Sequence, residues 1–251
     1  YGKKYYYDPG IKEVQQHLTK VVEEVVENYA VDGIHFDDYF YPYKVAGEVF
    51  NDSLSYTQNK LPGQEIADWR RSNVDSLVKN VYQAIKAKKP WVRFGISPFG
   101  VWKNDTTDPS GSATKAGQTT YEDLYADPLL WMQHGWVDYM VPQAYWSMHY
   151  PAASHEIIAR WWAKNSSNTN LYMGNGAYKI RNNTDEAWND KSEIPKQLAM
   201  ARNISEITGN VFFSAKSLVN TQGDVQEQLQ IKFYRKKATI PAMANIVSRA
   251  I

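Results

Sequence analysis

The chain has 251 residues, which suits one large domain with a substantial buried core. Its 28 basic and 27 acidic residues give a formal net charge of +1, so the charge gives no reason to expect a nucleic acid or an anionic membrane surface as a partner. The sequence has no cysteine, which excludes disulfides, thiolate metal sites and a cysteine nucleophile, and it has no apolar run of about 18 residues that would indicate a membrane span.

Helical and strand-like patterns alternate along the whole chain. The first helix has a clear start, because Asp8 is a suitable N-cap and Pro9 would occupy the first helical position. In chain order we predict a helix within residues 8–33, a strand at 34–36, a helix at 68–89, a strand at 92–100, a helix at 121–134, a strand at 138–146, a helix at 155–165, a strand at 171–178, a helix at 193–207, a strand at 210–217 and a closing helix at 224–237. Five apolar strands alternating with helices indicate an α/β fold with a parallel sheet.

The distribution of polar and aromatic residues favours one type of α/β fold. No G-x-G-x-x-G or Walker loop follows the first strand, so a nucleotide-binding sheet has no support. Polar and aromatic side chains gather where the strands end, and in a (β/α)8 TIM barrel the chemistry collects at that end of the strands. Only five of the eight strands are visible. We therefore expect residues 1–251 to form a single domain that is the C-terminal portion of a longer barrel, with a partial barrel completed by another chain as the alternative.

The stretch 31-VDGIHFDDYFYP-42 drives an apolar strand into two adjacent acids followed by aromatic rings. On a barrel strand alternate side chains point inward, so His35 and Asp37 would share the inner side, and the loop would turn Asp38 back toward the mouth. Two carboxylates among rings at a strand end suit acid/base or nucleophilic catalysis on a glycosidic bond. The alternative is structural: Asp38 caps the next loop and Asp37 pairs with an arginine.

Several side chains near the other strand ends are candidates for binding sugar. Gln143 and Tyr145 would both face inward, beside Trp146, although a buried Gln that satisfies backbone groups is the alternative. Trp102 would form the wall of a sugar-binding subsite, with core packing as its alternative. The remaining predicted substrate-binding residues are His35, Tyr39, Asn175, Tyr178 and Lys216.

The sequence does not favour a metal or cofactor site. His149 and His155 have no acidic partners at the spacing of zinc ligands, and the oxygen-rich loop 104–112 lacks an EF-hand pattern. No G-x-S-x-G motif indicates a serine nucleophile. We therefore expect no metal and no cofactor.

Eight stretches that run in order over nearly the whole chain carry a family resemblance: 8-DPGIKEV-14, 32-DGIHFDDYFYP-42, 68-DWRR-71, 90-PWVRFGISPFGVW-102, 121-YEDLYAD-127, 135-GWVDYMVPQAYW-146, 171-LYMGNGAYK-179 and 211-VFFSAKSL-218. The sequence closely resembles the bacterial glycosyl hydrolase-like family 10, formerly domain of unknown function 187. This resemblance implies a TIM-barrel glycosidase fold. It also implies a protein that is exported, periplasmic or anchored in the cell envelope, because some family members are implicated in cutting cell-wall glycan.

The resemblance also implies a difference at the front of the chain. Family members carry an N-terminal portion, with the first barrel strands, ahead of the position that matches residues 5–8. A second catalytic acid would then be Asp38, a loop acid such as Glu48, Asp52 or Asp105, or a residue of that front portion.

These observations lead to one hypothesis and two alternatives. We expect a glycoside hydrolase that acts on a bacterial cell-envelope polysaccharide, with peptidoglycan glycan strands as one candidate, Asp37 as the principal catalytic carboxylate and Asp38 as its partner or orienting residue. A non-catalytic glycan-binding module that keeps the aromatic groove is the first alternative. A partial barrel that self-associates through its open sheet edges is the second.

Overall fold

The computed structural model describes residues 1–167, 169–221, 223–237, 243 and 246. In these residues five strands form one parallel sheet whose spatial order, β1-β2-β3-β4-β5, is also the chain order. The strands are β1 (Gly33–Phe36), β2 (Arg93–Ile96), β3 (Tyr139–Met140), β4 (Asn170–Asn175) and β5 (Ile207–Phe212). This open parallel sheet flanked by helices confirms the predicted α/β fold of a partial TIM barrel.

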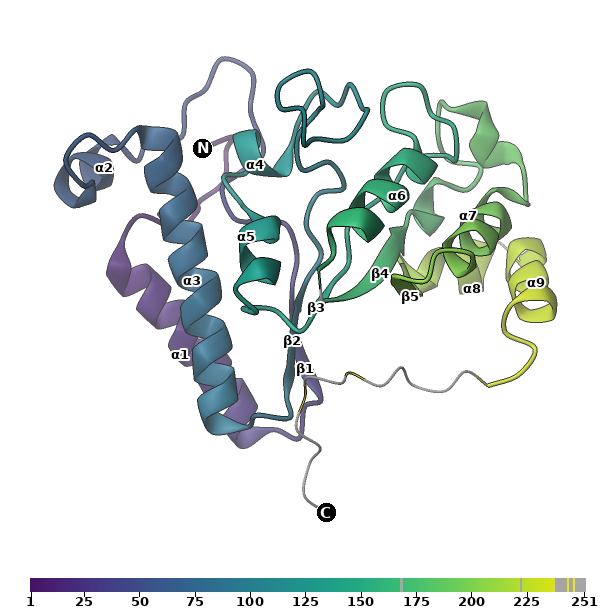
Figure 1. Cartoon of the computed structure of the whole chain (residues 1–251), viewed down its shortest axis with the longest axis horizontal. Helices are drawn as coiled ribbons and strands as arrows, with labels where there is room; N and C mark the ends of the chain where they lie inside the picture. Colours follow the sequence, from purple (N-terminus) through teal and green to yellow (C-terminus); the bar gives the residue numbers. More distant parts are fainter. Residues whose placement is uncertain (168, 222, 238–242, 244–245, 247–251) are drawn as a thin grey trace.

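Helices cover one face of the sheet and its two ends (Figure 1). α1 and α3 pack side by side next to β1 and β2, and α9 lies at the opposite end of the molecule. The α-helices are α1 (Lys12–Asn28), α2 (Ser53–Asn59), α3 (Ile66–Lys88), α4 (Thr120–Asp123), α5 (Pro128–Gln133), α6 (His155–Asn165), α7 (Glu193–Arg202), α8 (Ala215–Thr221) and α9 (Gly223–Lys232). Two 3-10 helices, η1 (Ala177–Lys179) and η2 (Glu186–Asn189), follow β4.

The predicted start of the first helix was wrong. α1 begins at Lys12, and Asp8 does not cap it. The Asp8 carboxylate instead accepts a hydrogen bond from the backbone N–H of Gly10 at 2.8 Å and one from the hydroxyl of Ser55 in α2. Asp8 therefore closes a turn and ties it to α2, a helix that the sequence pattern did not reveal.

The last predicted strand was also misplaced. β5 ends at Phe212, and the chain enters α8 at Ala215, so Lys216 is an exposed helical residue rather than the end of a strand. The strand also begins earlier than predicted, at Ile207, and includes Gly209. A Cβ atom at Gly209 would come within 2.8 Å of the Tyr172 ring, so this glycine permits a close packing contact.

Alternation along the strands separates a dry face from a polar one. Phe94 and Ile96 of β2, together with Met140 of β3, are fully buried against the helices. Burial of side chains of this size stabilises the fold by roughly 1.5–3 kcal/mol each. The intervening residues face the other side of the sheet, where the candidate site is built.

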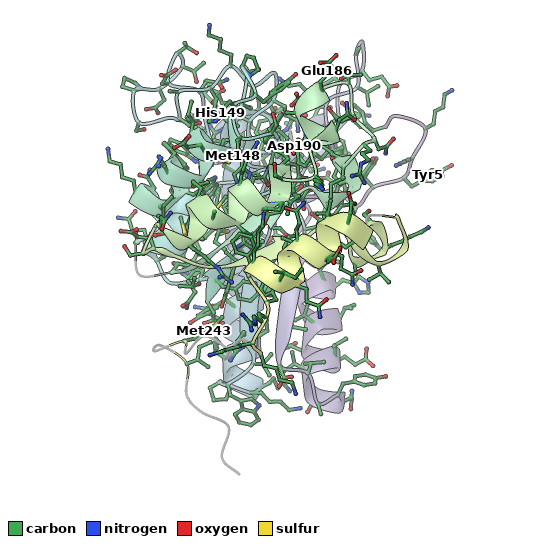
Figure 2. All side chains as sticks on the ribbon, turned by 90° about the vertical axis from the view of Figure 1, so that its right-hand side faces the viewer. Tyr5, Met148, His149, Glu186, Asp190 and Met243 are labelled. Carbon is green, nitrogen blue, oxygen red and sulfur yellow. The ribbon has the colours of Figure 1, made fainter. Side chains whose placement is uncertain are left out.

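The long segments that follow the strands gather at one end of the molecule, which we call the mouth (Figure 1). Figure 2 shows His149 and Glu186, which lie after β3 and β4, at this end and Met243 at the opposite end. The carboxyl ends of parallel strands share one edge of a sheet, so strand-end residues far apart in sequence meet here.

Candidate functional site

Asp37 immediately follows β1 and is exposed at the mouth. Its Oδ1 atom accepts a hydrogen bond from Gln143 Nε2 at 2.6 Å and one from the backbone N–H of Asp38 at 2.9 Å. Gln143 Nε2 also lies 2.9 Å from the carbonyl oxygen of Ser97, beyond the end of β2. Three strand ends therefore converge on one carboxylate, as expected if Asp37 and Gln143 both point inward.

His35 lies one inward position below Asp37 and is fixed through both ring nitrogens. Its Nε2 atom is 2.5 Å from Ser97 Oγ, its Nδ1 atom is 3.0 Å from the Tyr139 hydroxyl, and its ring stacks on Tyr139 at 5.7 Å. Burial lowers the pKa of His35, and the negative charge of Asp37 opposes this shift. His35 is therefore mostly neutral at pH 7 and suits a supporting role beneath Asp37. Sequence reasoning missed Ser97 and Tyr139 as its partners, although both stand at inward positions of their strands.

Asp38 is 2% exposed, whereas its neighbour Asp37 is exposed. Its carboxylate accepts a hydrogen bond from the Tyr43 hydroxyl. Burial raises the pKa of Asp38 to about 6, the Tyr43 hydrogen bond opposes this, and the charge of Asp37 adds to it. Of the two roles that the sequence allowed, this geometry favours the orienting one. Tyr43 was missed, although it stands in the same aromatic segment.

The other acids named from the sequence lie in different surroundings. Asp52 is buried in a two-pronged ion pair, with Arg70 Nε at 2.8 Å from one carboxylate oxygen and Nη2 at 2.6 Å from the other. Asp52 therefore has a structural role, as the partner of Arg70. Glu48 is exposed and accepts a hydrogen bond from the backbone N–H of Gly2 at 2.8 Å, and Asp105 is exposed.

Tyr145 and Tyr178 belong to a cluster of rings at the mouth. The Tyr145 ring stacks on Phe213 at 6.0 Å, and Tyr178 meets both rings edge-on at 5.9 and 5.7 Å. Burial raises the pKa of Tyr145, and the charge of Asp37 adds to the shift. Sequence reasoning missed Phe213, which is 54% exposed. Its position just after β5 was the available signal.

The two candidate tryptophans have different surroundings. Trp146 is half-buried and packs against the edge of Phe99 at 5.5 Å. Trp102 is 7% exposed and stacks on Trp161 at 5.7 Å, and its indole N–H donates to Asp127 at 3.3 Å. Trp102 offers no free face to a sugar, which favours its alternative, core packing.

Asn175 and Lys216 do not join the site. Asn175 is fully buried and donates to the side chain of Gln197 in α7 at 2.9 Å, so it faces the helices. Lys216 lies in the first turn of α8 because β5 ends earlier than predicted.

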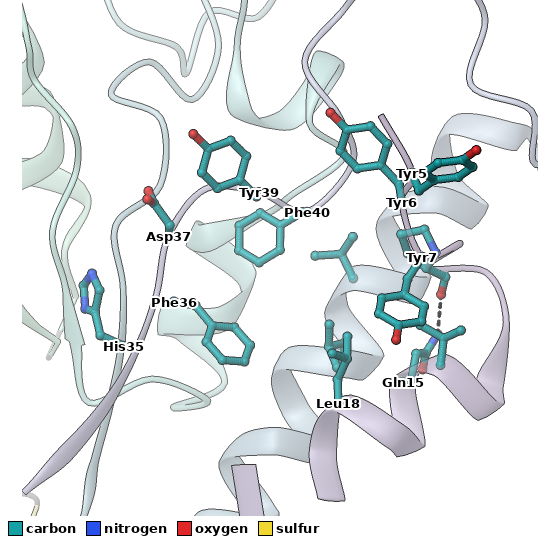
Figure 3. Close-up of a pocket in the computed structure, with 14 residues that line it drawn as sticks. Tyr5, Tyr6, Tyr7, Gln15, Leu18, His35, Phe36, Asp37, Tyr39 and Phe40 are labelled. Carbon is teal, nitrogen blue, oxygen red and sulfur yellow. Dashed lines mark hydrogen bonds between the residues drawn. The ribbon is translucent and has the colours of Figure 1, made fainter. Parts of the chain in front are cut away.

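A pocket of about 450 Å³ opens beside Asp37, between β1 and the packed pair α1 and α3. Figure 3 shows His35 and Asp37 on one side of β1 and Phe36 on the other, with Tyr39 and Phe40 above. Tyr39 is 74% exposed, and the consecutive tyrosines 5, 6 and 7 form the far wall. Aromatic rings around a carboxylate suit the apolar faces and hydroxyls of sugars.

The described part of the chain holds no group of three or more histidine, aspartate or glutamate side chains placed to bind a metal ion. Within the same residues, no helix combines the length and the apolar character that crossing a membrane requires.

A family model and several known proteins match this sequence. The family model described as "Glycosyl hydrolase-like 10" matches residues 1–190. The "Glycosyl hydrolase YngK" of Bacillus subtilis (strain 168) is 46% identical over 246 residues, which is 97% of this chain and 48% of that relative. The "Glycosyl hydrolase DigH" of Escherichia coli (strain K12) is 40% identical over 219 residues, which is 84% of this chain and 49% of that relative. DigH of Shigella flexneri matches to the same extent.

The chain thus spans about half the length of these relatives. The family description and the names of these relatives are those of glycosyl hydrolases. The chain belongs to the glycosyl hydrolase-like 10 family.

Proposed function

We propose that this chain forms part of the active site of a glycoside hydrolase that acts on a bacterial cell-envelope polysaccharide, with peptidoglycan glycan strands as the leading candidate. One observation carries the proposal: the exposed carboxylate of Asp37 stands at a strand end of the mouth, held by Gln143 at 2.6 Å and by the Asp38 backbone at 2.9 Å. Catalytic residues of TIM-barrel enzymes occupy this position.

In this proposal Asp37 is the catalytic carboxylate, acting as nucleophile or as acid/base. Gln143 orients it, and Asp38 fixes the backbone that donates to it. Glycosidases of both stereochemical classes use a second carboxyl group. Asp105 and Glu48 are exposed candidates for this group among the described residues, and a carboxylate from a further protein segment is the alternative.

The surroundings of Asp37 support a sugar substrate. The exposed ring of Tyr39 lines the pocket on one side of the carboxylate, and the cluster of Tyr145, Tyr178 and Phe213 lies on the side of β4 and β5. We propose that these rings bind sugar units, and that residues 1–251 act as one domain. A cell-envelope substrate lies outside the cytoplasm, so we also propose that the protein is exported and acts in the periplasm or at the envelope.

The test is cleavage of peptide-free cell-wall glycan strands, followed by analysis of the released oligosaccharides. It uses this chain and the longest natural polypeptide that contains it. The Asp37→Asn variant should lose cleavage, because it keeps the shape of the side chain and removes its charge. Asp32→Asn is the matched control, since Asp32 is an exposed aspartate at the other end of the same strand. Cleavage that survives in Asp37→Asn would contradict the assignment of this residue.

A non-catalytic glycan-binding module is the second candidate, and the burial of Asp38 favours it, because Asp38 is then not a second acid at the mouth. This candidate predicts that glycan strands bind but are not cut by either polypeptide. Self-association through the open edges of β1 and β5 stays a prediction. Light scattering on the purified chain checks it, and a single monomeric species counts against it.

A further inference from the structure

Lys179, which the sequence-based candidates did not include, brings a positive charge to the mouth. It lies in η1, directly after Tyr178, and is half-buried. Its Nζ atom is 5.9 Å from the centre of the Trp146 ring and 5.9 Å from the centre of the Tyr178 ring. Both rings belong to predicted sugar-binding residues, so the ammonium group lies at the surface where a glycan would pass.

A continuous row of rings connects this lysine to the acid pair. Tyr39 contacts Tyr43 at 6.1 Å, Tyr43 contacts Phe99 at 6.4 Å, and Phe99 contacts Trp146 at 5.5 Å, each edge-on. We call these four residues the aromatic strip. Tyr43, the second ring of the strip, donates to the carboxylate of Asp38, and the Trp146 end lies under Lys179. A glycan lying on the strip would extend from Asp37 to the ammonium group.

The charge of Lys179 is not neutralised by an ion pair among the described residues. Asp185 is the acid whose field reaches it, but the Asp185 carboxylate accepts hydrogen bonds from Ser147 Oγ at 2.5 Å and from the backbone N–H of Ala187 at 3.1 Å. Burial lowers the pKa of Lys179, and Asp185 opposes this shift. A bound anion would offset the cost of burying the ammonium group.

We propose that Lys179 and the Trp146 end of the aromatic strip form a subsite for a sugar unit that carries a carboxylate. The inference rests on the proposed glycan-processing function and assigns to Lys179 the recognition of an acidic sugar unit. A carboxylate fits better than a phosphate monoester, because among the described residues Lys179 is the cation that lies over the Trp146 and Tyr178 rings, and the charge of Asp185 disfavours a doubly charged group. The Lys179 ammonium would donate to the carboxylate while Trp146 supports the sugar ring.

The test measures binding rather than cleavage. Isothermal titration calorimetry would compare three probes: peptide-free cell-wall glycan strands, the same strands with their carboxyl groups converted to methylamides, and a neutral chitin oligosaccharide. The variants are Lys179→Met, which keeps an apolar stem, and Lys179→Arg, which keeps the charge. Lys164→Met is the matched control, because Lys164 is an exposed lysine in the last turn of α6.

We expect Lys179→Met to weaken binding of the carboxylated strands about tenfold and to leave binding of the methylamide strands unchanged. Lys179→Arg should retain most of the affinity, and Lys164→Met should match the parent chain. The affinity of the parent chain for carboxylated strands should fall with added salt, and that of Lys179→Met should fall less.

Three outcomes would overturn the inference. An equal loss for charged and methylamide strands would give Lys179 a structural role only. Unchanged binding in Lys179→Met would show that the ammonium group does not meet the ligand. Binding of the neutral chitin oligosaccharide as tight as that of the carboxylated strands would show that the subsite does not select a carboxylate. A failure of the proposed function is a separate result, since it is an absence of cleavage while these binding differences stay measurable.

Discussion

The amide nitrogen of Gln143 donates to the carboxylate of Asp37 at 2.6 Å and to the carbonyl oxygen of Ser97 at 2.9 Å. One side chain on the continuation of β3 therefore ties together the ends of β1 and β2. The backbone around Gln143 is itself fixed by bridges to Phe99 and Gly174 on either side. Asp37 is thus held by a group that is positioned by the sheet rather than by a loop.

Replacing Gln143 by leucine should reduce glycan cleavage about 10- to 100-fold, because the carboxylate loses a charge-assisted hydrogen bond and its fixed orientation. The measurement is kcat/KM for release of oligosaccharides from peptide-free glycan strands. Gln133→Leu is the matched control, since Gln133 is an exposed residue at the end of α5. Equal activity of the two variants would show that Gln143 does not orient the reacting group.

Asp38 should make the stability of the protein depend on pH. Burial raises its pKa from 3.8 to about 6 in the folded protein. Between these two values the folded state binds the proton more tightly than the unfolded chain does, so the contribution of Asp38 to the free energy of unfolding falls as the pH rises through this window. Above it, the buried ionised carboxylate destabilises the fold.

Asp38→Asn should therefore raise the free energy of unfolding at pH 7.5 by about 1–2 kcal/mol and change it little at pH 4, because an asparagine oxygen still accepts the Tyr43 hydrogen bond. Urea unfolding at the two pH values measures this difference. Asp32→Asn, at an exposed site, should stay within about 0.5 kcal/mol at both. A variant that is less stable at pH 7.5 would show that the ionised form is favoured in the fold.

The order of the elements and the place of Asp37 could be predicted from the sequence. Strand length and alternation are local properties, so 34-IHF-36 fixes which side of β1 His35 and Asp37 occupy. The same logic placed Gln143 correctly. For the positions of Asp37 and Gln143, period-two alternation along the strands was sufficient.

Other features depend on contacts between distant residues and could not be predicted. The burial of Asp38 depends on how the segment after β1 folds back to bring Tyr43 to its carboxylate. Trp102 is buried because the ring of Trp161, 59 positions later in the sequence, covers it. The sequence pattern around a tryptophan that follows a strand is the same whether its ring is free or covered. The sequence therefore could not distinguish a subsite wall from core packing for Trp102.

Breaking the buried ion pair of Arg70 should destabilise the fold strongly. The Asp52 carboxylate accepts two hydrogen bonds from the Arg70 guanidinium. This guanidinium also lies over the Tyr125 ring, 4.8 Å from its centre. Asp52→Asn leaves this cation buried without a counter-charge, which should cost about 3–5 kcal/mol in urea unfolding. Glu27→Gln, which breaks the exposed pair with Lys88, should cost at most about 0.5 kcal/mol. Similar losses in both variants would mean that Arg70 finds water when Asp52 is replaced.

Gly95 of β2 should not tolerate a side chain, because a Cβ atom there would lie 2.1 Å from the Tyr139 ring. Gly95→Ala must displace this ring, which stacks on His35. The Tyr139 hydroxyl also forms a hydrogen bond with Nδ1 of His35. The expected cost is about 1–3 kcal/mol of unfolding free energy. Gly117→Ala is the control, since nothing lies within 4 Å of a Cβ atom built at Gly117.

A double variant separates this clash from a general effect of alanine in a strand. Removing the ring in Tyr139→Ala leaves room for the new methyl group, so the combined change with Gly95→Ala should cost less than the sum of the two single changes. Urea unfolding of the four proteins gives this coupling energy, which should be about 1 kcal/mol or more. Costs that simply add would show that the Tyr139 ring moves aside freely, and His35 would then not depend on Gly95 for its place beneath Asp37.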